Sequence, residues 1–204
     1  MALDTFANLR TAIGTWGTRT YSNDQAAEFI LLAESKINRR LGPQYRRETT
    51  TTLNTDANGE VSLPSGFIGM RSITRDLAGS QPLIPVSWRA LINLNAYEES
   101  GVPVNYAISG STLKVAPICD DNFIAVYWAS LTALSDANAS NWLLAHSPDV
   151  YLFYCRAAQA AFEEEFDKAA VFEAQAEKGL DEVVGQGTVA QYAAAEMVLE
   201  GVTP

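Results

Sequence analysis

The stretch 147–186 constrains the fold most, because all of its local signals agree. Ser147 is a favoured helix N-cap, and Pro148 suits the first helical position, where its missing N–H leaves no hydrogen bond unmade. Apolar residues then recur three or four positions apart: Tyr151, Tyr154, Ala158, Ala161 and Phe162. This spacing places them on one side of a helix, and we expect that side to be buried.

A second helix follows at once and completes an antiparallel helical hairpin. Asp167 is expected to cap it, and Gly185 and Gly187 are expected to end it. Its apolar positions keep helical spacing: Ala170, Phe172, Ala176, Leu180, Val183 and Val184. Two helices this rich in alanine bury too little apolar surface to be stable alone, so the hairpin requires further helices.

The N-terminal residues supply two more helices. Asp4 is expected to cap the first, which Gly17 ends, and Ser22 with Gln25 forms a capping box for the second. The second helix has a clear apolar stripe: Phe29, Ile30, Ala33, Ile37 and Leu41. The Gly-Pro pair at 42–43 is expected to stop it.

Between the helical pairs the periodicity changes to two, which indicates strands. We expect 49–53 and 60–63 to form a hairpin around Asn58-Gly59, and Ser87 to cap a short helix reaching Tyr97. The other strand candidates are 66–75, 81–86, 104–109, 112–116 and 123–130, and 131–146 is a polar loop.

These elements predict an α+β fold, mainly α, in which a four-helix bundle is interrupted by a β-rich insertion. The N- and C-terminal helix pairs, residues 1–46 and 140–186, would form the bundle. Residues 47–139 would form the β-rich insertion with its short helix, and 187–204 a C-terminal docking tail.

The charge is distributed unevenly along the chain, whose net charge is −10. Residues 1–89 hold 10 Lys/Arg against 8 Asp/Glu, whereas residues 90–204 hold 4 against 16. Such asymmetry favours head-to-tail contact between unlike surfaces or a face kept away from nucleic acid, although a solvated acidic surface explains it equally. The N-terminus lacks the pattern of a signal peptide, which favours a cytosolic-type product.

The sequence contains few residues that could form an active site or a metal site, and we expect no cofactor. His146, the only histidine, has no partner base near it in the sequence, so a small hydrolase is a remote alternative. The segment from Asn54 to Gly59 resembles part of a calcium loop but lacks its first and last ligands. Cys119 and Cys155 are interpreted as small buried apolar residues.

A basic cluster lies at the end of the second predicted helix and just beyond it: Arg39, Arg40, Arg46 and Arg47. The sequence pI of about 4.5 argues against a protein that binds phosphates tightly. We therefore interpret these arginines as a partner interface that contacts acidic groups on another protein.

Several loose motifs, in this order, resemble the head-to-tail adaptor (connector) proteins of tailed bacteriophages. They are Leu63-Pro64-Ser65-Gly66-Phe67 after a hairpin, the loop from Asn141-Trp142-Leu143-Leu144 to Ser147-Pro148-Asp149, and the Tyr151-Leu152 helix with its alanine-rich partner. The resemblance covers most of 1–186 and also fits the capped N-terminal helix pair.

The resemblance implies a non-enzymatic virion protein located in the neck, at the head-tail junction, and in the host cytoplasm during assembly. Its copies would form a ring, typically twelve-fold in the family, between the portal protein and a downstream tail or nozzle protein. Genomic DNA would pass through this ring without sequence-specific binding. A tail-terminator or baseplate component is the alternative.

The C-terminal segment after Gly187 is too apolar for a discarded tail. We expect Tyr192, Met197, Val198 and Leu199 to anchor it on a partner, which the resemblance implies is the portal. The alternative is that it folds back on its own bundle.

Overall fold

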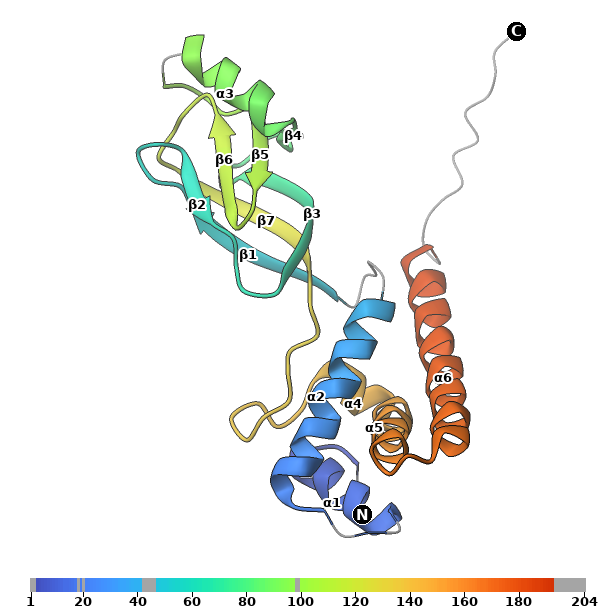
Figure 1. The fold of residues 1–204 in the computed structure, drawn as a ribbon. Coiled ribbons are helices and arrows are strands. Elements are labelled where there is room, and N and C mark those ends of the chain that lie inside the picture. Colours follow the sequence, from blue (N-terminus) through green and yellow to red (C-terminus); the bar gives the residue numbers. More distant parts are fainter. Residues whose placement is uncertain (1–2, 18, 20, 42–46, 98–99, 193–204) are drawn as a thin grey trace, which may run out of the picture. The chain divides into compact units, whose positions relative to one another are not determined.

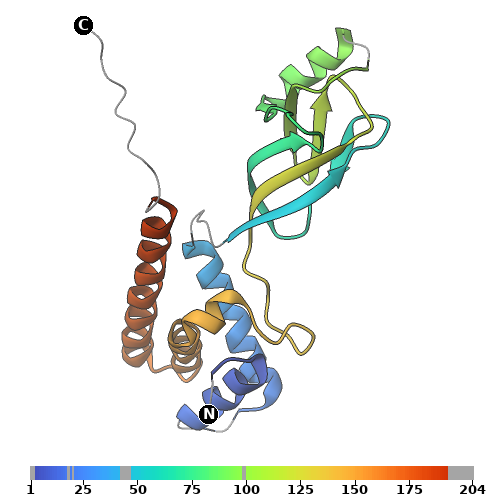
Figure 2. The ribbon, with the colours of Figure 1, turned by 180° about the vertical axis from the view of Figure 1, so that it is seen from behind.

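The computed structural model describes residues 3–17, 19, 21–41, 47–97 and 100–192. The chain divides into two compact units, one comprising Met1–Arg46 with Leu131–Pro204 and the other Arg47–Ser130. The first contains helices α1 (Phe6–Trp16), α2 (Asn23–Arg40), α4 (Trp142–His146), α5 (Pro148–Phe162) and α6 (Phe166–Tyr192). The second contains β1 (Glu48–Asn54), β2 (Glu60–Ser62), β3 (Phe67–Arg75), β4 (Ile84–Pro85), α3 (Trp88–Tyr97), β5 (Asn105–Ser109), β6 (Thr112–Ala116) and β7 (Asn122–Ala129) (Figures 1 and 2).

The expected four-helix bundle with a β insertion is wrong. The described residues form a mixed α+β fold with six helices and two sheets. One helix, α4, was missed because 131–146 reads as polar. Asn141 caps it, however, and its Leu143 and Leu144 are fully buried in the helical core, which therefore draws on five helices of unequal length.

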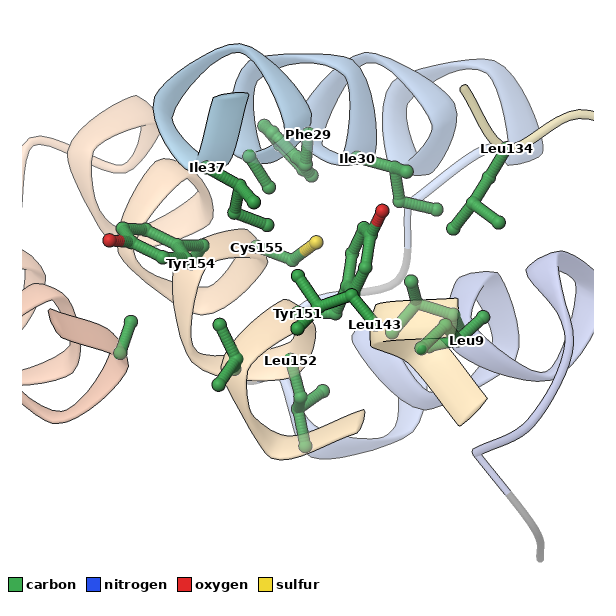
Figure 3. Close-up of a cluster of buried hydrophobic side chains, with 14 of the residues drawn as sticks. Leu9, Phe29, Ile30, Ile37, Leu134, Leu143, Tyr151, Leu152, Tyr154 and Cys155 are labelled. Carbon is green, nitrogen blue, oxygen red and sulfur yellow. The ribbon is translucent and has the colours of Figure 1, made fainter. Parts of the chain in front are cut away.

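The helical core forms where the apolar sides of these helices meet (Figure 3). Leu9 comes from α1, Ile30 and Ile37 from α2, Leu143 from α4 and Tyr151 from α5, and all are nearly or fully buried. Leu131 and Leu134 also belong to this cluster, so the segment just before α4 packs with the helices. Burial of this apolar surface holds the unit together.

The helix ends agree only partly with the expected signals. The Ser22–Gln25 capping box and the Ser87 cap are confirmed, and Pro148 occupies the first turn of α5. Three helix starts differ from the expectation. Thr5 caps α1 in place of Asp4, the Ser147 side chain makes no capping hydrogen bond, and α6 begins at Phe166, one residue before Asp167. Helix α6 also continues through Gly185 and Gly187 to Tyr192.

The second unit contains two sheets, with strand orders β1-β7-β3 and β2-β6-β5-β4. The strands expected at 104–109 and 112–116 form β5 and β6, which pair with each other antiparallel. The hairpin expected between 49–53 and 60–63 is wrong, because β1 pairs with β7 and β2 with β6. Hydrogen bonds from Thr55 to the carbonyls of Cys119 and Asp121 hold the chain where it passes from one sheet to the other.

Candidate functional site

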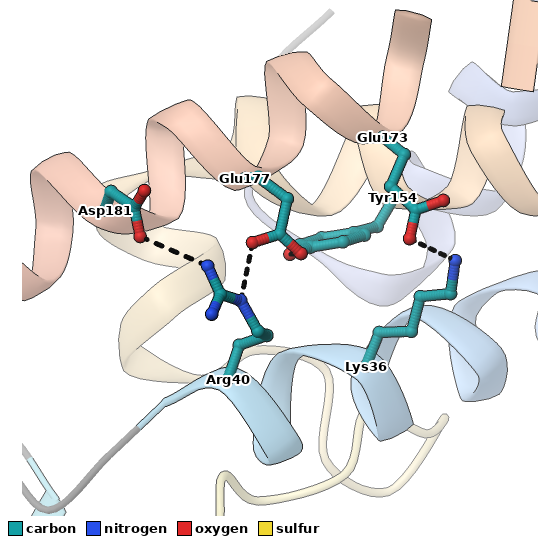
Figure 4. A network of polar contacts seen from close by, with 6 residues as sticks. All are labelled: Lys36, Arg40, Tyr154, Glu173, Glu177 and Asp181. Atoms are coloured by element: carbon teal, nitrogen blue, oxygen red, sulfur yellow. Dashed lines mark hydrogen bonds and ion pairs between the residues drawn. The ribbon is translucent and has the colours of Figure 1, made fainter. Parts of the chain in front are cut away.

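The exposed end of α2 carries the first two residues of the predicted basic cluster, and Arg40 is paired within its own unit. Its Nε donates to Glu177 Oε2 at 2.6 Å, and its Nη2 lies 3.5 Å from Asp181 Oδ1 (Figure 4). One turn earlier, Lys36 Nζ pairs with Glu173 Oε1 at 2.7 Å. These ion pairs join α2 to α6 along one side, so the Arg40 guanidinium already has partners within its own unit.

Glu177 is the centre of this network because it also accepts a hydrogen bond from the Tyr154 hydroxyl, at 2.9 Å. Burial raises the pKa of Tyr154, and the hydrogen bond to Glu177 raises it further. The same Glu177 contact raises the pKa of the exposed Arg40 guanidinium. Tyr154 therefore remains neutral and Arg40 charged, which suits a fixed structural contact better than proton transfer.

Arg39 differs from its neighbour. Its side chain is exposed, and no described residue forms an ion pair or hydrogen bond with it. Arg47 differs again, since it lies in the other unit, is only 4% exposed and donates from Nε to the Ala129 carbonyl at 2.9 Å. Burial lowers its pKa. Arg46 lies outside the described residues, so among the described arginines of this cluster only Arg39 is available to a partner.

Most of the predicted C-terminal anchor residues also lie outside the described residues. Tyr192 is the last residue of α6, but the position of its side chain is not described. Met197, Val198 and Leu199 lie beyond the described residues. Their role as anchors stays a prediction.

A groove opens in the helical unit between α2, α5 and α6, with a volume of about 440 Å³. Its walls are mostly apolar and include five alanines. The lining side chains are Glu28, Phe29, Leu32, Ala33, Ser35, Lys36, Arg39, Tyr154, Ala157, Ala158, Ala161, Phe162, Ala169 and Glu173. Arg39 therefore stands at a mainly apolar surface.

Part of the groove wall consists of apolar positions that were expected to be buried. Phe162 and Ala161 complete the stripe predicted for α5, yet both are exposed and Phe162 retains 62% of its surface. Leu32 of α2, which lies outside the predicted stripe of that helix, is 54% exposed. Phe162 packs edge-on against Phe29 and Tyr21, with ring centroids 5.7 and 6.5 Å away, so this end of the groove has a well-packed wall.

The remaining candidates for chemistry do not assemble into a site. His146 is exposed at the end of α4, with its Nδ1 at 2.8 Å from the Trp142 carbonyl. Asp56 of the partial calcium loop accepts from the backbone N–H groups of Asn58 and Glu60, and these bonds lower its pKa. Within the described ranges no cluster of three or more His, Cys, Asp or Glu could hold a metal ion.

Two further properties bear on the class of protein. Both cysteines are free, with Cys155 buried in the helical core. None of the helices in the described part of the chain combines the length and apolar character that crossing a membrane requires. The candidate site is therefore the apolar groove, with the exposed guanidinium of Arg39 at its rim. A surface of this kind can bind another polypeptide.

Sequence reasoning missed the buried polar contact that fixes this unit. Glu34 of α2 is 5% exposed and accepts from the Leu134 backbone N–H at 2.8 Å. A signal was present, because Glu34 lies four residues after Ile30 and three before Ile37, on the apolar side of the helix. A carboxylate at such a position must find an internal partner.

Comparison with known proteins finds a family match but no curated relative. A family model described as SU10 adaptor protein matches residues 4–198, which span both units. No curated protein matches the chain. On the strength of this match over nearly its whole length, the chain belongs to the SU10 adaptor protein family.

Proposed function

We propose that this protein is a head-to-tail adaptor whose copies form a ring beneath the portal, connect capsid to tail and continue the DNA channel. The family match over residues 4–198 carries this proposal, because it indicates a phage adaptor, which is a structural protein of the virion. Portal protein, a downstream tail protein and further copies of the chain would be its partners. The proposal involves no catalytic step.

The charge distribution supports a ring built from unlike surfaces. The excess of acid lies in residues 90–204, whereas residues 1–89 are slightly basic. Arg39 offers an exposed cation from the basic part, and α6 presents exposed acids such as Asp167 and Glu182. A heterologous contact between two such surfaces can repeat until the ring closes.

The same acidic excess suits a protein through which DNA must move. A surface with many carboxylates repels phosphates, so a duplex would pass without being held and without its sequence being read. This is the expected behaviour of a channel segment.

Electron microscopy of the protein mixed with its portal tests the proposal. We expect one additional ring of density beneath the portal and no ring on portal alone. Addition of the protein to isolated tail ends, with none to portal, would instead assign it to the tail terminus and overturn the proposal.

A further inference from the structure

The groove between α2, α5 and α6 has the properties of a site for an apolar peptide. Leu32 and Phe162 are large, apolar and more than half exposed on its walls. Phe162 packs edge-on against Phe29 and Tyr21, so the wall does not depend on an occupant for its shape. An open apolar groove of this kind favours burial of a partner's side chains.

The C-terminal segment of the chain has a matching composition. Met197, Val198 and Leu199 form a short apolar run, which Glu196 and Glu200 flank. The apolar run suits the groove walls, and the flanking carboxylates suit Arg39, whose guanidinium pairs with no described residue.

The segment cannot place this run in the groove of its own chain. Among the described side chains of α6, only Ala169 and Glu173 line the groove, and Glu173 lies 19 residues before Tyr192, about 28 Å along the helix. From Tyr192, the seven residues to Leu199 reach about 25 Å even when fully extended. An occupant with this sequence must therefore come from another molecule.

We propose that the groove binds the C-terminal segment of a second copy of this chain, with Met197 and Leu199 against Leu32 and Phe162 and a flanking carboxylate on Arg39. Each copy would then give its segment to one neighbour and accept a segment from another, which is a heterologous contact. The inference relies on the proposed function only for the closure of these contacts into a ring. It assigns the segment to a neighbouring copy in place of the portal.

A labelled peptide of residues 191–204 tests the site directly. Titration of the full-length chain should raise the fluorescence anisotropy of the peptide to saturation. Leu32→Asp should weaken binding by about tenfold or more, because it places a charge on the apolar wall. Leu31→Asp is the matched control, since Leu31 is 63% exposed on the same helix but does not line the groove, and it should change binding by less than about twofold.

Cross-linking of full-length chains covers the case in which the groove is already occupied in an oligomer. A Leu32→Cys chain mixed with a Met197→Cys chain should form a disulfide-linked pair under mild oxidation. A Leu31→Cys chain should form it no more than the wild type does.

Three outcomes would overturn the inference. They are equal loss of peptide binding in the two aspartate variants, equal cross-linking of the two cysteine variants, and peptide binding to isolated portal with none to this chain. The last outcome would leave the adaptor function intact, because that function fails only if no ring forms on the portal.

Discussion

The hydroxyl of Tyr151 on α5 donates to the carboxylate of Glu34 on α2 at 3.3 Å, inside the helical unit. The same carboxylate oxygen accepts from the Leu134 backbone N–H, and Asn141 Nδ2 donates to the Tyr151 hydroxyl at 2.7 Å. These bonds attach the segment before α4 to α2 and α5. Burial raises the pKa of Glu34, and the hydrogen bonds only partly oppose this effect.

The raised pKa of Glu34 predicts a pH-dependent stability. The folded chain binds this proton more tightly than the unfolded chain, so the stabilisation is complete below the unfolded pKa and is lost as pH rises through the folded pKa. As the pH falls through the raised pKa of folded Glu34 towards the ordinary glutamate pKa of 4.5, this group should make the free energy of unfolding increase. Denaturant unfolding at several pH values measures it.

Substitutions at Glu34 separate its charge from its hydrogen bond. Glu34→Gln retains the acceptor for the Leu134 N–H and should abolish the pH dependence due to this group. Glu34→Ala leaves that N–H without its partner and should cost about 1–3 kcal/mol. Glu28→Gln, which removes an exposed carboxylate from the same helix, is the control, and an equal loss of pH dependence there would contradict the assignment.

The continuation of α6 through Gly185 makes a second prediction. A Cβ added at Gly185 meets no atom within 4 Å, so Gly185→Ala should stabilise the chain by about 0.5–1 kcal/mol by removing a helix-interior glycine. At Gly179 a Cβ would lie 3.0 Å from Val150 Cγ2 on α5, so Gly179→Ala should gain less or lose stability. If Gly185 instead ended the helix, Gly185→Ala would lower the helicity that circular dichroism measures.

The turn between α5 and α6 makes a third prediction. Glu164 has φ 62°, and the N–H groups of Glu164 and Glu165 donate to the carbonyls of Ala161 and Ala160, the pattern of a Schellman motif. Glycine adopts this conformation without strain, so Glu164→Gly should raise the free energy of unfolding by about 1 kcal/mol. Glu163→Gly, at φ −81°, should give no gain in the same unfolding experiment.

Local signals predicted most elements of this fold correctly but not the pairing of strands that lie far apart in the sequence. The capping box at Ser22 and the apolar stripe of α2 act within one helix, and both are confirmed. The pairing of β1 with β7 joins Glu48 to Trp128, and no local pattern contains a contact that distant in sequence. Turn chemistry at Asn58-Gly59 is present, yet it connects strands of different sheets.

The candidate site shows the same limit. The sequence predicted Arg39 and Arg40 as members of one basic cluster. Only the packing of α2 against α6 decides that Arg40 forms ion pairs with Glu177 and Asp181, whereas Arg39 stays exposed. It also identified the stripe ending at Phe162 without revealing that its last turn stays uncovered. Periodicity indicates which side of a helix is apolar, whereas the length of the neighbouring elements decides how much of it is buried.

The difference between the two arginines makes the final prediction, which concerns assembly. Arg39→Glu should leave the free energy of unfolding within about 0.5 kcal/mol of the wild type, because no described contact is lost. It should nevertheless weaken ring formation on the portal, with the greater effect at low salt.

Arg40→Glu should instead destabilise the monomer, since it places a third carboxylate beside Glu177 and Asp181. Arg89→Glu makes the same charge change at an exposed position of α3 and serves as the control in sedimentation and salt titration. Assembly that is equally weakened by the Arg39 and Arg89 variants would mean that net charge, and not a contact at Arg39, governs the ring.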